Sequence, residues 1–426
     1  MLASLVAIGA CSSVVSGGGG GGATGGTGGT GATGGIGGTG ATGGTGATGA
    51  TGGAGGTGGT SGIDFGPPPP VSAAIPTSPS ASGVSLVAGD DAHLLAWCEP
   101  ILDGFRVVSQ RLAADGQPID ATPLEVTTFA GSYCETAAAH APGGPFLVAW
   151  IRESPGHTVE AARVSAELEV LDAPIFIAAG DVASNGAVWS ALWRVGASGV
   201  EGAYLVSYER VDDTDMGHMY QQRVTTDGVL ISTPEQLGEL DPPFALQVGD
   251  AVLQLWTDYT PSFYGVHARV GNAPPVHIST PDHFGGEAVA AFDGDGVLVV
   301  WSEKEEPNDF TSFGTITATI LDPSSPGPGQ PFYISQPGHA VAGAVVAYMG
   351  DHYLVVWQDK GKLLGARVAP DGTLIDLEGF VVSDEGSLAG QGLAVRDGVA
   401  LVLYYVVGPS PAETVTYLRA IGELGP

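Results

Sequence analysis

One short pattern recurs along most of this chain and constrains the fold more than any other feature. Its cleanest copy, Asp351 to Ser383, holds a run ending in Trp357, a second run with Arg367, an Asp-Gly turn and a third run. Six further copies of the first run end in an aromatic anchor, at Trp97, Trp150, Tyr208, Trp256, Trp301 and Tyr404. Successive anchors are separated by 53, 58, 48, 45, 56 and 47 residues. This spacing indicates one supersecondary unit repeated seven times.

The second run of the unit places arginine at one position in six of the seven copies. These residues are Arg111, Arg163, Arg223, Arg269, Arg367 and Arg419. An Asp-Gly pair follows clearly in three copies, at Asp115-Gly116, Asp227-Gly228 and Asp371-Gly372. Asp-Gly supplies the positive φ that a tight turn between strands needs. The pattern therefore predicts strands joined by turns.

Each unit predicts four short strands, which in the fifth copy cover 287–292, 297–302, 313–321 and 331–335. Inner runs such as Leu298-Val299-Val300 are apolar on both faces, which is typical of strands covered by protein on both sides. We predict an all-β, seven-bladed β-propeller of four-stranded antiparallel blades. The last copy has no fourth run after Arg419, so we expect Val71 to Ile75 to close the seventh blade.

The composition of the N-terminal region indicates that the protein is exported, and it divides the chain into three parts. Residues 1–10 form a short apolar signal, 11–69 a Gly/Thr/Ala-rich tether expected to be disordered, and 70–426 the propeller. The tetrapeptide Ile8-Gly9-Ala10-Cys11 resembles a bacterial lipobox, which implies that Cys11 is lipidated. An ordinary secretory signal with an incidental cysteine is the alternative. With this lipobox, tether and repeat, the whole chain resembles uncharacterised secreted lipoproteins of myxobacterial type.

The charge balance limits the partners. With 14 Lys and Arg against 45 Asp and Glu, the net charge is −31, which disfavours nucleic acid and anionic lipid surfaces. No later segment offers a long apolar run, so the membrane contact we expect is the N-terminal lipid alone. We expect a monomer in the bacterial cell envelope, at the outer membrane on its periplasmic or surface side.

Cys98 and Cys134 are predicted to form a disulfide. Cys98 ends the second strand of the first unit, and Cys134 begins the first strand of the next. Antiparallel pairing brings these two strand ends to the same face of adjacent blades, and export provides an oxidising compartment.

Several polar residues are candidates for chemistry, each with a structural alternative. The repeated arginines would form a cationic ring for an anionic ligand, or pair with carboxylates and loop carbonyls; their place on the third strand favours the structural role. Carboxylates follow the anchors at Glu99, Glu153, Glu209, Asp258, Glu303 and Asp359. These would bind Ca²⁺ through oxygen ligands, or stand as solvated strand ends.

Three further groups are candidate metal ligands. Asp212, Asp213 and Asp215 form an acidic loop and are a weak cation site candidate, while Asp293-Gly294-Asp295-Gly296 is better interpreted as a turn. His267, His277 and Asp282-His283 cluster in the fourth unit, but alternating strand positions do not bring ligands together as zinc requires. No cofactor is expected beyond the Ca²⁺ hypothesis. The anchors Trp97, Trp150, Trp256, Trp301 and Trp357 are interpreted as core packing.

No catalytic motif names a reaction in this sequence. The near-uniform repeats favour a binding or scaffold module for a protein or glycan partner, and disfavour an enzyme. The alternative is an extracellular propeller-type hydrolase or lyase acting on a polysaccharide, with carboxylates as acid and base. A purely structural envelope protein is a third hypothesis. Any site is expected where copies depart from the pattern, in the longer loops after Tyr208 and Trp301.

Overall fold

The computed structural model describes the chain from residue 67 to residue 422. Gaps lie at 68, 73, 80–81, 153–156, 181–190, 201, 212–216, 232, 239–243, 261–262, 281–282, 305–313, 326, 328, 337–341 and 409–413. Cys11, Glu153, the Asp212, Asp213 and Asp215 loop, and Asp282 therefore lie outside the described residues. Within the described part of the chain, no helix is long and apolar enough to cross a membrane.

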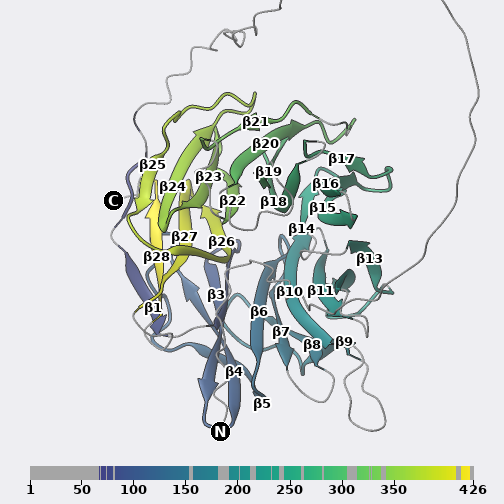
Figure 1. Cartoon of the computed structure of the whole chain (residues 1–426). Coiled ribbons are helices and arrows are strands. Elements are labelled where there is room, and N and C mark those ends of the chain that lie inside the picture. The colour runs from purple at the N-terminus through teal and green to yellow at the C-terminus, as the bar shows by residue number, and fades with distance from the viewer. Residues whose placement is uncertain are drawn as a thin grey trace, which may run out of the picture. The chain divides into compact units, whose positions relative to one another are not determined.

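The described residues form seven four-stranded sheets arranged in a ring, so the predicted seven-bladed propeller is confirmed (Figure 1). All strand pairs within the sheets are antiparallel, and the first six blades take their strands in chain order from the inside of the ring outward. The first three blades comprise β2 (Ser82–Ala88), β3 (His93–Ile101), β4 (Gly104–Leu112) and β5 (Leu124–Ala130); β6 (Cys134–His140), β7 (Phe146–Arg152), β8 (Thr158–Val164) and β9 (Ile175–Ala179); β10 (Ala191–Val200), β11 (Ala203–Val211), β12 (Gly217–Thr225) and β13 (Glu235–Gly238).

The next three blades follow the same order. They comprise β14 (Phe244–Val248), β15 (Ala251–Thr260), β16 (Phe263–Val270) and β17 (Val276–His277); β18 (Phe284–Phe292), β19 (Val297–Lys304), β20 (Thr315–Leu321) and β21 (Phe332–Tyr333); β22 (Ala342–Tyr348), β23 (Tyr353–Asp359), β24 (Lys362–Val368) and β25 (Phe380–Ser383). The four strands predicted for the fifth copy therefore all exist, although the outer strand is shorter than expected.

The seventh blade closes the ring with a strand from the N-terminal side of the propeller, as predicted, but this strand begins at Ile75, where the predicted strand Val71 to Ile75 ends. It contains β26 (Ser387–Arg396), β27 (Val399–Val406), β28 (Val415–Ile421) and, as its outer strand, β1 (Ile75–Pro79). Ile75 pairs with Leu418, and an isolated bridge joins Val71 to Ile421. Because the blade is built from both ends of the propeller, separating the ends would also break a sheet.

Antiparallel pairing defines two faces of the ring. On the upper face the first strand of each blade begins and the second strand ends; on the lower face a tight turn joins these two strands. Cys134, which begins β6, is paired with Arg152, which ends β7, and both therefore lie on the upper face. The lower face carries turns such as the one between β2 and β3.

Apolar side chains fill the interfaces between neighbouring blades, which we call seams. Seven clusters of buried apolar residues occur in the described chain, and each is shared by two adjacent blades. The anchors Trp150, Trp301 and Trp357 are at most 2% exposed and belong to these clusters. Strands apolar on both faces are therefore needed because each blade packs against two others.

The seam between the third and fourth blades also contains a buried polar network. Gln254 donates from Nε2 to Gln221 Oε1 at 2.6 Å, and Gln221 donates to Ser207 Oγ at 3.0 Å. Arg269 donates to Gln254 Oε1 and to Glu235 of the preceding blade. Hydrogen bonding of each buried amide is what makes this burial tolerable.

Candidate functional site

The repeated arginines contact carboxylates and loop carbonyls. In the first, second and sixth blades the guanidinium donates two hydrogen bonds to an aspartate nine residues later: Arg111 to Asp120, Arg163 to Asp172, and Arg367 to Asp376. Arg111 and Arg163 also donate to a carbonyl of the next blade, Ala166 O and Thr226 O, each at 2.6 Å. The Asp120 and Asp172 pKa values are lowered, chiefly by the hydrogen bonds from these arginines.

Sequence reasoning missed the three aspartates, although Arg and Asp recur at a separation of nine residues in three copies. The other described contacts differ: Arg269 pairs with Gln254 and Glu235, and Arg419 donates to Tyr404 Oη and Ser72 O. Arg163 lines a hollow of about 420 Å³ on the lower face. Its Nε, Nη1 and Nη2 already have protein partners there.

The described carboxylates that follow the anchors lie on the upper face, and Glu99, Asp258 and Glu303 are held there by protein partners. Glu99 forms a bidentate pair with Arg106 at 2.8 and 2.9 Å, and Asp258 accepts a hydrogen bond from Trp256 Nε1 at 3.1 Å. Glu303 is 3% exposed and accepts from Thr280 N and from Thr317 Oγ1. Among the described residues, no three His, Cys, Asp or Glu side chains form a group that could hold a metal ion.

Trp256, His267 and His277 form a column of rings across three strands of the fourth blade. His267 stacks on Trp256 with ring centroids 5.7 Å apart, and His277 lies 5.3 Å beyond it. His277 Nε2 is 2.9 Å from Ser279 Oγ, and His267 Nε2 is 3.6 Å from Asp258 Oδ2. The pKa values of both imidazoles are lowered, mainly by burial. His283 instead approaches Glu303, at 3.8 Å.

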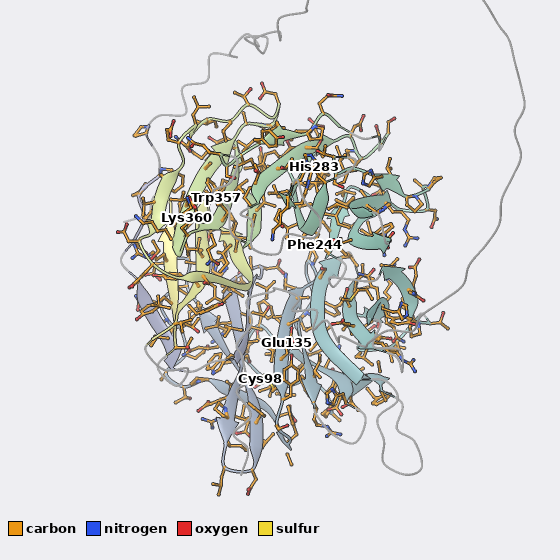
Figure 2. All side chains as sticks on the ribbon, viewed as in Figure 1. Cys98, Glu135, Phe244, His283, Trp357 and Lys360 are labelled. Carbon is orange, nitrogen blue, oxygen red and sulfur yellow. A yellow bond between two sulfur atoms is a disulfide. The ribbon has the colours of Figure 1, made fainter. Side chains whose placement is uncertain are left out.

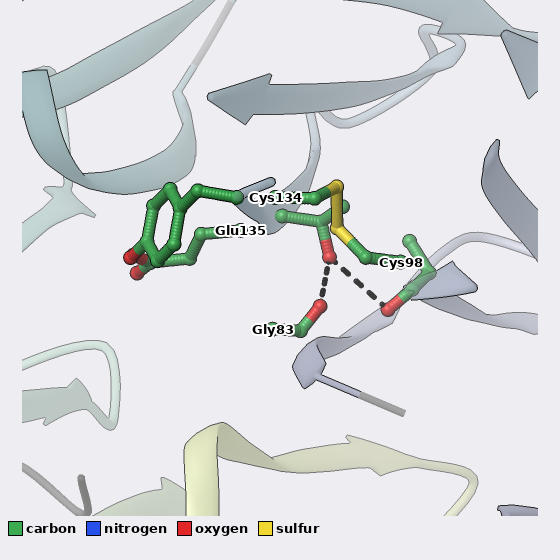
Figure 3. Close-up of a disulfide and its surroundings, with 7 residues drawn as sticks. Gly83, Cys98, Cys134 and Glu135 are labelled. Atoms are coloured by element: carbon green, nitrogen blue, oxygen red, sulfur yellow. Dashed lines mark hydrogen bonds between the residues drawn. A yellow bond between two sulfur atoms is a disulfide. The ribbon is translucent and has the colours of Figure 1, made fainter. Parts of the chain in front are cut away.

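The predicted disulfide between Cys98 and Cys134 is present and joins the first two blades at the upper face (Figure 3). Cys98 is fully buried and Cys134 is 4% exposed. Cys134 is the first residue of β6, an inner strand, so the covalent link lies beside the innermost layer of the ring.

A carboxylate and a phenol meet directly beside this disulfide, and neither residue was among the sequence-based candidates. Tyr133 Oη donates to Glu135 Oε2 at 2.7 Å, and both side chains are only partly buried. Glu135 belongs to an inner strand, whereas the carboxylates after the anchors belong to second strands. The signal that the sequence contains is an acidic residue directly after Cys134, at the start of a predicted inner strand. Figure 2 shows Glu135 and His283 on separate blades.

His157 completes this group. Its ring stacks against Tyr133 with centroids 6.5 Å apart and an interplanar angle of 14°. The side chain is 9% exposed, and the backbone has φ 49°, a left-handed conformation that is unusual for a residue other than glycine. Such backbone strain is concentrated at functional sites in proteins. Tyr133, Glu135 and His157 therefore define the candidate site on the upper face of the second blade.

Comparisons with known proteins give matches among solved structures alone. No protein-family model matches the chain, and no curated protein sequence matches it. An alpha-L-arabinanase of Penicillium chrysogenum, complexed with arabinobiose, matches at 15% identity and TM-score 0.45, covering 67% of this chain and 92% of its own. An alpha-L-arabinofuranosidase of Fusarium graminearum matches at 12% identity and TM-score 0.46, covering 82% of this chain and 94% of its own.

A neuraminidase-like protein of subtype N10, from a little yellow-shouldered bat strain, matches at 10% identity and TM-score 0.44. It covers 82% of this chain and 98% of its own length. These matches are to an arabinanase, an arabinofuranosidase and a neuraminidase-like protein, and they share the propeller fold with this chain. They go against the predicted binding or scaffold module and agree with its alternative, an extracellular hydrolase or lyase acting on a polysaccharide. The Tyr133–Glu135 pair lies outside the repeated positions, so the uniformity of the repeats says nothing about it.

Proposed function

We propose that this protein is an extracellular propeller-type hydrolase that cleaves a polysaccharide, with its reacting groups on the upper face of the second blade. The observation that carries the proposal is the 2.7 Å hydrogen bond from Tyr133 Oη to Glu135 Oε2. It places a partly exposed carboxylate on an inner strand with a phenol as its fixed donor. Carboxylates are the groups that most glycoside hydrolases use as acid, base or nucleophile.

The chemistry assigned to the pair is general base catalysis. The hydrogen bond from Tyr133 orients the Glu135 carboxylate, which acts as the proton acceptor. Glu135 removes a proton from the attacking water, whose oxygen bonds to the anomeric carbon as the glycosidic C–O bond breaks. The leaving oxygen receives a proton from His157, and transfer from Glu135 back to His157 through solvent restores both groups. One water is consumed for each bond cleaved.

Hydrolysis of a panel of neutral polysaccharides by the full chain tests this function, with release of reducing sugar as the measurement. The panel includes arabinan, since an arabinanase and an arabinofuranosidase are among the solved structures similar to this chain. We expect Glu135→Gln to lower kcat by about 10²- to 10⁴-fold, the usual contribution of a general base. Tyr133→Phe should lower it less, because the carboxylate remains.

Glu99→Gln is the matched control, since Glu99 is also an upper-face carboxylate but is paired with Arg106. It should leave kcat within about twofold of the wild type, as expected for an exposed ion pair remote from the reaction. An inactive wild type across the panel, or a fully active Glu135→Gln variant, would show that the proposed function is wrong.

We further propose that the protein is exported and anchored to the bacterial cell envelope through a lipid on Cys11. The support is the Ile8-Gly9-Ala10-Cys11 sequence, preceded by a short apolar run. Labelled palmitate should be incorporated by the wild type and not by Cys11→Ala. Incorporation that persists in Cys11→Ala would refute the anchor without affecting the hydrolase proposal.

A further inference from the structure

Glu135 lies between two residues that are each fixed to the first blade. On one side, Cys134 is bonded to Cys98. On the other side, the Thr136 hydroxyl donates to Gly83 O and lies 3.4 Å from Ala96 O (Figure 3). Both residues are buried, with Cys134 at 4% and Thr136 at 5% exposure. The backbone of Glu135 is therefore held in place by the contacts of the residue before it, Cys134, and the residue after it, Thr136.

Strand alternation places these contacts on one face of β6 and the Glu135 carboxylate on the other. Successive side chains of a strand point to opposite faces, so Cys134 and Thr136 share one face and Glu135 has the other. Cys134 packs into the seam with the first blade, whereas Ala137, on the same face as Glu135, packs into the seam with the third. The fixing contacts are thus all on the side of the strand away from the Tyr133–Glu135 pair.

Gly83 makes the close approach of the two inner strands possible. It has φ 55°, and a Cβ added there would lie 2.7 Å from Glu135 Cα and 2.8 Å from Thr136 N. No side chain fits at that distance, so glycine is required for β2 to touch the backbone of Glu135. Two residues further along, Ala138 N donates to Ser85 Oγ at 2.9 Å, which extends the same contact between β2 and β6.

We propose that the Cys98–Cys134 disulfide, Thr136 and Gly83 are positioning residues, and that they hold the Glu135 backbone where its carboxylate meets Tyr133 and the substrate. This inference rests on the proposed function. Its physical basis is that a misplacement of about 1 Å in a catalytic group can cost about 10²-fold in rate. The disulfide then serves turnover in addition to stability, and its reduction slows the reaction before it unfolds the protein.

The test compares Thr136→Val with Thr136→Ser and with Thr317→Val in the full chain. Thr136→Val keeps the shape but removes the hydroxyl, and we expect kcat to fall about tenfold with KM within twofold. Thr136→Ser should restore it. Thr317→Val is the matched control: Thr317 is also a buried threonine that donates to a neighbour, Glu303, but in the fifth blade. It should lower the melting temperature without lowering kcat.

The double variant Cys98→Ser with Cys134→Ser should give the same kcat loss at temperatures where circular dichroism shows it folded. A second readout is independent of activity: amide hydrogen exchange at Glu135, Thr136 and Ala137 should accelerate at least tenfold in Thr136→Val and not in Thr317→Val. An inactive wild type would refute the proposed function, while the exchange rates would still decide the positioning. Unchanged exchange in Thr136→Val, or equal kcat losses in Thr136→Val and Thr317→Val, would overturn the positioning role.

Discussion

Two seams of the propeller differ at one equivalent position, four residues before the aromatic anchor. In the sixth blade this position is Tyr353, whose hydroxyl reaches back to the lower-face turn of the fifth blade and donates to Gly296 O at 3.0 Å. In the first blade it is His93, which faces the corresponding turn of the seventh blade. His93 is fully buried, and neither ring nitrogen has a hydrogen-bond partner among the described residues.

Other blades show that this position serves contact with the preceding blade. Tyr204 Oη donates to Pro145 O of the second blade's turn, and Phe146 packs on Gly89 of the first. Burial raises the pKa of the Tyr204 and Tyr353 phenols, so they stay neutral around pH 7, and a benzene ring does not titrate. An imidazole titrates near neutral pH, so at this position the seam that closes the ring is expected to depend on pH.

The largest expected effect comes from protonating His93. Burial, followed by the Arg396 charge, lowers the pKa of His93 to about 4, with Asp397 acting in the opposite direction. On the elements around it, Leu112 and Ala88 are its strand partners and carry no charge. Because the unfolded imidazole titrates near 6.5, the unfolded state binds the proton first, and stability falls as pH drops from 6.5 towards 4. From pH 7.5 to 4.5 the loss should be about 2.5 kcal/mol.

Urea denaturation at the two pH values measures this loss, as the difference between the wild type and His93→Phe. The subtraction removes the contributions of the other buried histidines, His140, His267 and His277, whose pKa values are also lowered by burial. The Arg–Asp pairs do not affect this difference in stability. Because the pKa values of Asp120 and Asp172 are lowered, the stability that these pairs contribute is lost only at more acidic pH. Equal acid sensitivity of the wild type and His93→Phe would contradict the comparison.

The architecture could be predicted from the sequence alone because the repeat is a pattern of local strands and turns. Anchor spacing predicts the seven blades, and the missing fourth run after Arg419 predicts the closing strand. Connectivity and compartment together predict the Cys98–Cys134 disulfide. These features depend on chain order, which the sequence displays directly.

The candidate site depends on contacts between blades and on loops, which chain order does not display. His93, Tyr204 and Tyr353 occupy one aligned position, yet only the closed ring shows that each faces the preceding blade. The sequence does not single out the Tyr133–Glu135 pair, because carboxylates recur after the anchors and not at this position. A residue that occurs once in seven copies leaves no periodic signal.

Removing the hydroxyl at the Tyr353 seam should have the next largest effect. Tyr353→Phe should lower the free energy of unfolding by about 1 to 1.5 kcal/mol, the usual net value of a neutral hydrogen bond in a buried setting. The loss stays moderate because Gly296 O also accepts a hydrogen bond from Asp293 N at 3.1 Å. Urea denaturation at pH 7.5 measures it. A loss that varies with pH would mean that the phenol contributes through charge, and this would contradict the contrast between the Tyr353 seam and the His93 seam.

His93→Phe at pH 7.5 should stabilise the protein by about 1 kcal/mol, because an apolar ring replaces a buried imidazole with two unsatisfied nitrogens. Phe146 shows that a phenylalanine is accommodated at the equivalent position, packed against a turn glycine. Gly398 offers a comparable turn residue beside Asp397. The measurement is the urea midpoint at constant m-value. Destabilisation would indicate that the closing seam lacks room for the larger ring.

The smallest effects should come from the two charges at the closing turn, and they should have opposite signs. Arg396 lowers the pKa of His93 and Asp397 raises it. Arg396→Gln therefore brings the folded pKa closer to 6.5 and should reduce the loss of stability between pH 7.5 and 4.5, while Asp397→Asn should increase it, each by a few tenths of a kcal/mol. Asn suits position 397, where φ is 53°, since asparagine tolerates the left-handed region. Both variants are compared with the wild type by the same pair of urea curves. If they shift the acid sensitivity in the same direction, the titrating group at this seam is not His93, and the contrast with the Tyr353 seam must rest on packing alone.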